Sequence, residues 1–283
     1  MQLLLGKPIA DRLLRHVAEC IALGGVIPGL AVILVGDDPA SEIYVGLKEK
    51  AAQSVGVHFE KHVLPTIATT EEVCALVVSL NQRADIHGII VQLPLVDSID
   101  ADAVIAAIDP AKDADGFHPK TVERFITGTT LVPPVFPRAI LTLLASAGVP
   151  LAGKQALAFV NSALFARVMT VALARFDIHT DTSLGLNPEA ITSEVQAADI
   201  VISAKGDPHF LTGDMVRPGA IVIDGGITRI GERVMSDANP ETFLGKDGFI
   251  TPVPGGVGPV TVALLIARTA ELALGEDIGE SIL

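Results

Sequence analysis

The feature that most constrains the fold is an alternation between short apolar runs rich in β-branched residues and longer segments of helical period. This alternation is typical of parallel strands joined by crossover helices, so it predicts an α/β fold. In the first half the expected strands are 30–35, 57–64 and 88–93, and the expected helices are 9–22, 40–54 and 70–82.

A second series of the same kind follows the proline cluster Pro133, Pro134 and Pro137. Its expected elements are a helix over 138–147, strands over 155–160, 177–182, 199–204 and 220–224, and a last helix over 259–274. We therefore expect two domains with parallel-rich sheets. The first comprises residues 1–120 plus 259–283, the second is Rossmann-like and comprises residues 137–258, and residues 121–136 connect them.

Charge and cysteine content narrow the functional classes. The chain carries 20 basic and 33 acidic side chains, and so has a net charge of −13. This charge argues against a protein that binds the phosphates of nucleic acids. Its two cysteines, Cys20 and Cys74, lie in helical apolar patterns and are interpreted as small core residues. The apolar run at residues 3–5 is too brief for a signal peptide, and no uninterrupted apolar stretch has the length of a membrane span. We expect a cytoplasmic protein with no nucleic-acid or membrane partner.

Four polar residues stand where an α/β sheet binds ligands. Tyr44 and Lys48 are four residues apart on an expected helix, so they share a face. Gln92 ends the third expected strand and Asp115 follows it, near the carboxyl ends of strands that bind ligands in open α/β sheets. Taken alone, a tyrosine and a lysine at this spacing more often cover a solvated helix face, and a polar residue that ends a strand is often a turn former.

In context, these residues resemble the bifunctional methylenetetrahydrofolate dehydrogenase/methenyltetrahydrofolate cyclohydrolase family, from about residue 6 to residue 274. The specific segments are Ser41-Glu42-Ile43-Tyr44-Val45-Gly46-Leu47-Lys48, Val91-Gln92-Leu93-Pro94-Leu95, Lys112-Asp113-Ala114-Asp115-Gly116-Phe117 and Pro252-Val253-Pro254-Gly255-Gly256-Val257-Gly258-Pro259. The resemblance implies a folate cleft between the two domains, a tetrahydrofolate derivative as substrate and a homodimer formed through the second domain.

The resemblance also implies residue roles. Tyr44 would pack over the pterin ring, Asp115 would accept its hydrogen bonds, and Lys48, assisted by Gln92, would serve the chemistry at the one-carbon bridge. The segment with Pro254, Gly255 and Gly256 would contribute to substrate binding. The chemistry agrees, because a cationic methenyl carbon needs a placed water and a proton acceptor, and a lysine whose pKa is lowered by burial can accept that proton.

The second half departs from the family at the expected dinucleotide site. Such a site needs glycines in the turn from the first strand to its helix, so that backbone N–H groups approach the phosphates. This chain has Val160-Asn161-Ser162, in which only Ser162 matches the family, and Ala166 replaces a further glycine. We interpreted Val160 as unable to adopt positive φ easily. NADP or NAD binding, and with it the dehydrogenase activity, is expected to be weak or lost.

Two further residues are candidates for cofactor contact. Asp181 lies about twenty residues past the turn, where an acid accepts hydrogen bonds from the ribose of NAD. Ile227 ends the segment Asp224-Gly225-Gly226-Ile227, which stays close to the family pattern. An acid at a strand end is more often a helix cap or solvated, and a glycine pair can simply form a tight turn.

The sequence therefore predicts an enzyme of folate one-carbon metabolism that retains methenyltetrahydrofolate cyclohydrolase activity. One alternative is a one-carbon transferase, in which Phe136, Val160 and Phe165 line an apolar pocket for another acceptor. Two others are an NAD-dependent dehydrogenase and a folate-binding subunit without catalysis. No metal is expected, because His58 and His62 share a strand face but have no third ligand nearby. His118 either lines the cleft or begins a helix.

Overall fold

The computed structural model describes residues 1–185, 188–231, 233–276 and 278, and the chain divides into two units. The three-stranded unit comprises Ala10–Val135 and the segment that starts at Val262. The six-stranded unit comprises Met1–Ile9 and Phe136–Thr261. The unit boundaries fall inside α1 (Gly6–Gly24) and α9 (Val257–Leu274), so each of these helices contributes residues to both units.

The three-stranded unit is built on a small parallel sheet. Its strands are β2 (Gly29–Val35), β3 (His58–Leu64) and β4 (Gly88–Val91), in the order β3-β2-β4. Every residue of β2 is buried because helices cover both faces of this central strand. Residues of α3 (Thr70–Asn81) and α4 (Ala101–Ala107) pack with alternate residues of β2 and β4 in one core cluster. The helix α2 (Pro39–Ser54) lies against β2 and β3.

The edge strand β3 carries an ion-pair network. The Glu60 carboxylate lies 3.0 Å from His58 Nε2 and 3.1 Å from His62 Nε2, and Arg83 binds it through two nitrogens. This network holds the pKa of Glu60 to about 2, chiefly through the hydrogen bonds from Arg83. His58 and His62 therefore pair with a carboxylate. Among the residues that the structure describes, no group of three His, Cys, Asp or Glu side chains is placed to hold a metal ion.

The six-stranded unit contains a parallel sheet in the order β1-β11-β8-β7-β5-β6. The strands are β1 (Gln2–Leu3), β5 (Gln155–Val160), β6 (His179–Ser183), β7 (Ile200–Ala204), β8 (Ile221–Asp224) and β11 (Phe249–Ile250). Because β5 pairs with β6 on one side and β7 on the other, the strand order reverses at β5. Ligands bind at the carboxyl ends of the strands at such a reversal.

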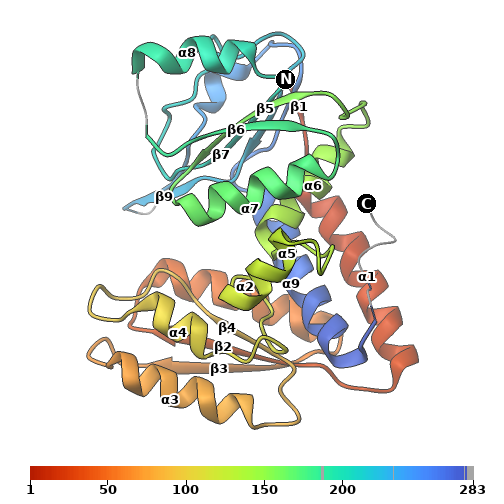
Figure 1. The fold of residues 1–283 in the computed structure, drawn as a ribbon, viewed down its shortest axis with the longest axis vertical. Helices are drawn as coiled ribbons and strands as arrows, with labels where there is room; N and C mark the ends of the chain where they lie inside the picture. Colours follow the sequence, from red (N-terminus) through yellow and green to blue (C-terminus); the bar gives the residue numbers. More distant parts are fainter. Residues whose placement is uncertain (186–187, 232, 277, 279–283) are drawn as a thin grey trace. The chain divides into compact units, whose positions relative to one another are not determined.

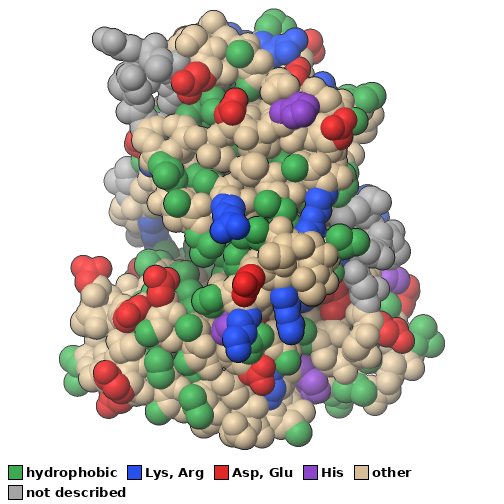
Figure 2. All heavy atoms as spheres, viewed as in Figure 1, with side chains coloured by type: hydrophobic (Ala, Val, Ile, Leu, Met, Phe, Trp, Pro, Cys, Tyr) green, Lys and Arg blue, Asp and Glu red, His purple; other side chains and the backbone are tan. Residues whose placement is uncertain are grey.

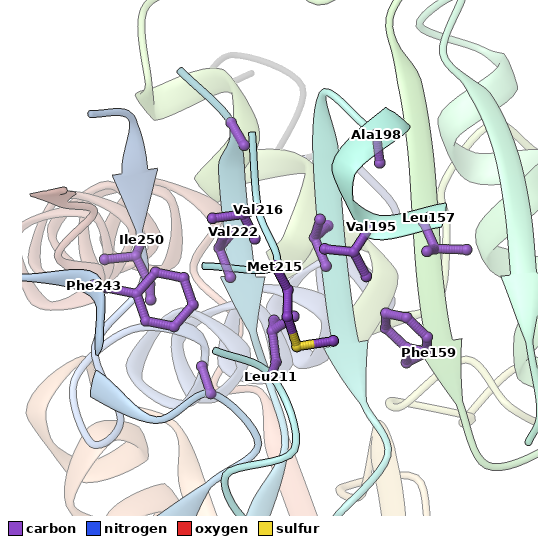
Figure 3. Packing of buried hydrophobic residues seen from close by; sticks show 13 residues of the cluster. Leu157, Phe159, Val195, Ala198, Leu211, Met215, Val216, Val222, Phe243 and Ile250 are labelled. Atoms are coloured by element: carbon purple, nitrogen blue, oxygen red, sulfur yellow. The ribbon is translucent and has the colours of Figure 1, made fainter. Parts of the chain in front are cut away.

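Helices cover both faces of this sheet. Figure 1 shows α7 (Ala163–Ala174) and α8 (Pro188–Ala197) on opposite faces. On one face Leu157, Phe159 and Val222 lie in a buried cluster that also contains Met215 and Phe243, as Figure 3 shows. Residues of alternate register, including Val160 and Ile202, are buried on the other face. After β8, the strands β9 (Ile227–Ile230) and β10 (Arg233–Ser236) form an antiparallel pair.

The remaining helices connect these parts. They are α5 (Pro119–Ile126) in the three-stranded unit, α6 (Val135–Ser146), which begins at the boundary between the units, and the short 3-10 helix Pro240–Phe243. Of the helices described, α9 alone has the length and apolar composition of a membrane span. Residues such as Val260 and Ile266 in α9 are fully buried in the protein, and a buried core helix passes the same test.

The expected α/β architecture is confirmed, with two differences in how the chain is divided. Residues 1–9 were expected in the first domain, but β1 pairs with β11, so they complete the six-stranded sheet. Residues 121–136 were expected as a connection, but most of α5 lies in this range and the three-stranded unit extends to Val135. On the face shown in Figure 2, acidic and basic side chains are interspersed.

Candidate active site

The helix α2 presents Tyr44 and Lys48 on one side. It begins after Asp38, whose carboxylate accepts the backbone N–H of Ser41 at 2.8 Å, and Pro39 occupies the first turn. Both Tyr44 and Lys48 are half-buried. Lys48 Nζ donates a hydrogen bond to Gln92 Oε1 at 2.6 Å. The structure therefore brings together two of the residues that the sequence singled out from segments 44 positions apart.

Gln92 is oriented by its own chain. It follows β4 directly, and its side-chain Nε2 donates to the carbonyl of Leu93 at 2.6 Å. With the amide nitrogen engaged there, the amide oxygen faces Lys48 Nζ. A neutral acceptor beside the lysine orients the amine without adding a negative charge, so Gln92 holds Lys48 without favouring its ammonium form as a carboxylate would.

Asp115 lies on the loop between α4 and α5 and is half-buried. Burial raises the pKa of Asp115, the positive charge of Lys48 opposes this rise, and the negative charge of Asp113 adds to it. Burial also lowers the pKa of Lys48, and Asp115 opposes that shift. The two side chains are thus electrostatic neighbours, and desolvation moves each toward its neutral form.

This arrangement provides two kinds of chemistry. An amine with a lowered pKa can accept a proton near neutral pH and return it later in a reaction. A carboxylate on a neighbouring loop can accept N–H donors of a polar heterocycle, and the face of Tyr44 can pack against a flat ring. The three-stranded unit therefore places an amine with a lowered pKa beside a carboxylate, an arrangement that can support proton transfer and hydrogen-bond acceptance.

The other substrate-binding candidates, Pro254, Gly255 and Gly256, lie in the six-stranded unit. Their segment packs closely on the start of α1, where Gly6 donates its N–H to the Gly255 carbonyl at 2.8 Å. A Cβ on Gly6 would lie 1.8 Å from the Gly256 carbonyl oxygen, and Gly255 has φ of +109°. Close backbone packing accounts for these glycines, whether or not they also contact a substrate.

The expected dinucleotide turn has an unusual structure. Val160 is the last residue of β5 and is fully buried, and α7 begins at Ala163. The Ser162 hydroxyl accepts the backbone N–H of Phe165 at 3.2 Å, so a donor at the helix N-terminus is already satisfied. Val160 does not have positive φ, as expected for a β-branched residue, since among the described non-glycine residues only Asp177 and His209 have positive φ.

The other candidate cofactor contacts are scattered at this sheet edge. Asp181 lies inside β6 rather than at its end, pairs with Leu157 of β5 and is exposed. Ile227 begins β9 and is 41% exposed. These placements leave the proposed cofactor roles of Ser162, Asp181 and Ile227 as predictions, and Ser162 is already engaged as a helix cap.

The apolar replacements near this turn fall into two groups. Val135, Val160 and Val168 are buried core residues. Phe136 and Phe165 are partly exposed and contact each other edge to face, with ring centroids 5.5 Å apart. A Cβ on Gly225 would lie 2.7 Å from Phe136 Cζ, so this ring also covers the end of β8. The residues therefore do not line one common apolar wall.

Two buried carboxylates organise the loops at the same edge. Asp237 accepts the Ser203 hydroxyl and the backbone N–H groups of Lys205, Gly206 and Asp207, the last three at 2.9, 3.2 and 2.8 Å. Asp224 accepts the N–H groups of Gly226 and Ala238 at 3.0 and 2.8 Å. The sequence analysis missed Asp237 because its partners lie about thirty residues away. His118 proves to be the N-cap of α5, since its Nδ1 accepts the Lys120 N–H.

A parallel sheet of doubly wound topology, joined to a second α/β unit that carries a lysine with a lowered pKa, is the architecture of a two-domain α/β enzyme. Residues 4–115 match the tetrahydrofolate dehydrogenase/cyclohydrolase catalytic domain, and residues 134–276 match the NAD(P)-binding domain of the same family. The chain belongs to the tetrahydrofolate dehydrogenase/cyclohydrolase family. The chain is 42% identical over 273 residues to bifunctional protein FolD 2 of Geobacter metallireducens, covering 95% of each.

Further relatives agree over the whole chain. Bifunctional protein FolD of Moorella thermoacetica is 42% identical over 277 residues, which is 96% of this chain and 98% of the relative. The structure of FolD from Campylobacter jejuni has a TM-score of 0.90 at 35% identity and covers 96% of this chain and 98% of its own. The structure of Trypanosoma brucei FolD, complexed with NADP cofactor and an inhibitor, has a TM-score of 0.90 at 32% identity and covers 95% and 96%.

Proposed function

We propose that this protein hydrolyses the methenyl form of tetrahydrofolate and that Lys48 is its proton-transfer residue. The observation that carries the proposal is the 2.6 Å hydrogen bond from Lys48 Nζ to Gln92 Oε1, beside Asp115, in the unit that matches the catalytic domain. Burial lowers the pKa of Lys48, and a lysine is useful as a base only when its neutral amine is populated.

The reaction balances with this residue as the carrier of the proton that passes from water to the departing nitrogen. A water oxygen forms a bond to the methenyl carbon, which bridges two nitrogens and is cationic, and the water proton passes to Lys48 Nζ. The resulting tetrahedral intermediate then collapses as one carbon–nitrogen bond breaks. The departing nitrogen takes the proton back from the Lys48 ammonium. The hydroxyl group of the intermediate loses its own proton to solvent water and becomes the carbonyl of the formyl group, so the net reaction releases one proton. Gln92 orients the amine in both steps.

Substrate recognition is assigned to Asp115 and Tyr44. A pterin ring presents N–H donors at its edge, and an ionised Asp115 would accept them through charge-assisted hydrogen bonds. Tyr44 lies one helical turn before Lys48 and would pack its ring over the pterin. Pro254, Gly255 and Gly256 are retained as candidate contacts from the other unit.

We further propose that the dehydrogenase activity is weak or lost, even though the six-stranded unit belongs to an NAD(P)-binding domain family. Three observations support this. The turn after β5 has no glycine. The Ser162 hydroxyl already accepts the backbone N–H of Phe165 at the start of α7. The Phe136 ring, which contacts Phe165, lies against Gly225 at the end of β8. A homodimer is a further expectation from the family resemblance, to be measured by light scattering.

The test is a paired assay of the purified protein. Hydrolysis of methenyltetrahydrofolate is followed by absorbance, and methylenetetrahydrofolate oxidation is followed with NADP and separately with NAD. Calorimetry measures binding of each nucleotide. We expect hydrolysis with no nucleotide binding at micromolar concentration. Micromolar binding of NADP would overturn the second proposal, and binding of NAD alone would favour the role of Asp181 as a ribose acceptor.

The assay also distinguishes the other candidates. Folate binding without turnover would favour a binding subunit. A transferase would be favoured if the protein bound folate and consumed the methenyl or methylene unit only when another acceptor was supplied. The edge-to-face contact of Phe136 and Phe165 favours neither, because the two rings pack against each other and Phe136 also packs against Gly225.

A further inference from the structure

Asp113 is a buried carboxylate two residues before the proposed pterin acceptor Asp115. It is 2% exposed. One of its oxygens accepts the backbone N–H of Gly116 at 2.9 Å, and the other accepts the N–H of His118 at 2.8 Å. Both acceptor atoms are thus used to close the loop around Asp115, and a buried carboxylate that satisfies two N–H groups is costly to replace.

The rest of the loop is held by its backbone. Ile89 of β4 donates its N–H to the Lys112 carbonyl at 2.8 Å, and Ile89 and Asp113 form a parallel bridge, so the loop continues the sheet beyond β4. On the far side of the turn, Val135 donates its N–H to the Asp115 carbonyl at 3.0 Å. Asp113 therefore closes a turn whose start is fixed by β4 and whose tip is fixed by the first residue of α6.

The same turn requires a glycine. Gly116 has φ of +84°, and a Cβ at this position would lie 2.8 Å from the Cα of Pro134. The Asp113 carboxylate accepts the N–H of this glycine, which fixes the left-handed residue directly after Asp115. The backbone of Asp115 thus has little freedom, so the direction of its side chain is set by its neighbours on either side.

Asp113 also acts on Asp115 through its charge. The charged groups that act on Asp115 among the described residues are Lys48 on α2 and Asp113 on its own loop. Asp113 favours the protonated form of Asp115, and Lys48 favours the ionised form that accepts hydrogen bonds. A neutral residue at position 113 would therefore change the electrostatics of Asp115 as well as its position.

We propose that Asp113 is a positioning residue for folate recognition, which holds Asp115 in place through the N–H groups of Gly116 and His118. The inference rests on the proposed function, because it gives Asp115 the role of pterin acceptor. Asp113 has no part in the proton transfer assigned to Lys48. Its loss is therefore expected to weaken binding and to leave the chemical step in place.

The decisive variant is Asp113→Asn, compared with Asp109→Asn as a matched control. Asp109 is an exposed carboxylate at the start of the same loop, and it accepts one backbone N–H, that of Ala111, at 2.9 Å. The side-chain amide of asparagine at position 113 keeps one oxygen acceptor. Its NH2 group replaces the other oxygen, so a donor faces one of the two backbone N–H groups. Dissociation constants for a tetrahydrofolate derivative, kcat, KM and melting temperature are measured for both variants over a range of pH.

For Asp113→Asn we expect the dissociation constant and KM to rise about tenfold, the change given by one lost charged hydrogen bond, with kcat within about threefold of the wild type. The acidic limb of the kcat/KM profile is expected to move to lower pH, because removal of the Asp113 charge makes Asp115 easier to ionise. Asp109→Asn is expected to match the wild type. An unchanged dissociation constant, or an unchanged acidic limb, in a folded Asp113→Asn protein would overturn the proposal.

A second variant keeps the proposal testable if Asp113→Asn does not fold. Val135→Pro removes the N–H that binds the Asp115 carbonyl, at the first position of α6, where proline suits a helix. This variant is expected to weaken folate binding and to leave the acidic limb of its kcat/KM profile unchanged, because the Asp113 charge is still present. Unchanged binding would show that the position of this loop does not control folate recognition, and would overturn the proposal. A wild-type protein that binds no folate would instead refute the proposed function, so the two failures are distinguishable.

Discussion

At the scale of single residues, the site depends on how burial changes two ionisable groups. Lys48 is half-buried on α2, and its hydrogen-bond partner Gln92 is neutral, so desolvation outweighs the attraction of Asp115 and the pKa of Lys48 is lowered. The position of Lys48 on a helix face could be predicted from its spacing to Tyr44. Its contact with Gln92 was expected only from the family resemblance and not from the spacing, because that contact depends on how α2 packs against the sheet and on the side-chain rotamers of both residues.

The residue-scale prediction concerns Lys48→Met, which keeps the apolar stem and removes the amine. We expect hydrolysis to fall by at least about a hundredfold, the usual contribution of a general base, with folate affinity nearly unchanged. In the wild type, kcat should rise with pH through a pKa below the ordinary lysine value, because the neutral amine is the active form. Stopped-flow absorbance and calorimetry measure these quantities.

The matched control is Lys50→Met, which removes an exposed lysine from the same helix. Its turnover should equal that of the wild type. Full turnover in Lys48→Met would refute the role assigned to this amine, and an equal loss in both variants would point to helix stability instead.

At the scale of elements, the apolar alternation predicted the strands from β2 to β8 with ends that differ by one or two residues. What it missed has physical reasons. The strands β1 and β11 have two residues each and pair with distant partners, and the β9–β10 hairpin was not distinguished from a glycine turn. The Asp237 contacts to the loop after β7 depend on tertiary proximity, which no local pattern encodes.

The element-scale prediction concerns the loops held by Asp224. Burial raises the pKa of Asp224 to about 7, above the ordinary value of an aspartate. Because the folded pKa is the higher one, this group stabilises the fold below about pH 4, and that contribution is lost as the pH rises to about 7. We expect the free energy of unfolding to fall by a few kcal/mol between about pH 4 and 7 from this group.

Urea unfolding at several pH values measures this effect. The comparison is with Asp224→Asn, which stays neutral, and the difference between the two proteins isolates Asp224 from His87, whose pKa is lowered by burial and which contributes in the opposite direction. Parallel pH dependences for the wild type and Asp224→Asn would show that Asp224 is ionised in the native state throughout.

At the scale of the whole molecule, the four proposed folate residues and the altered dinucleotide turn lie in different units. Tyr44, Lys48, Gln92 and Asp115 all lie in the three-stranded unit, and the altered turn at residues 160–162 lies in the six-stranded unit. Loss of nucleotide binding therefore need not disturb the contacts that Tyr44, Lys48, Gln92 and Asp115 make with a folate. This separation of the four residues from the altered turn could be inferred from the sequence, because all four precede the turn. The candidate contacts Pro254, Gly255 and Gly256 follow it and lie in the six-stranded unit.

The whole-molecule prediction is that a folate protects backbone amides from hydrogen exchange and that a nicotinamide dinucleotide does not. A tetrahydrofolate derivative at a hundred times its dissociation constant should stabilise the native state by about 2.7 kcal/mol and protect α2, β4 and the loop that carries Asp115. NADP or NAD at millimolar concentration should leave residues 161–166 unprotected. Protection of the α7 N-terminus by either nucleotide would show that a dinucleotide still binds there.

The pairing of β1 with β11 has a consequence for how the chain folds during synthesis. Gln2 and Phe249 are neighbours in the sheet, so the ribosome must add nearly the whole chain before the first strand meets its partner. At ordinary translation rates this delay is roughly 10 to 50 s. The strands β2, β3 and β4 all lie within residues 29–91 and can assemble much earlier. The N-terminal segment therefore stays unpaired during this time, and the six-stranded sheet is completed only after β11 has been synthesised.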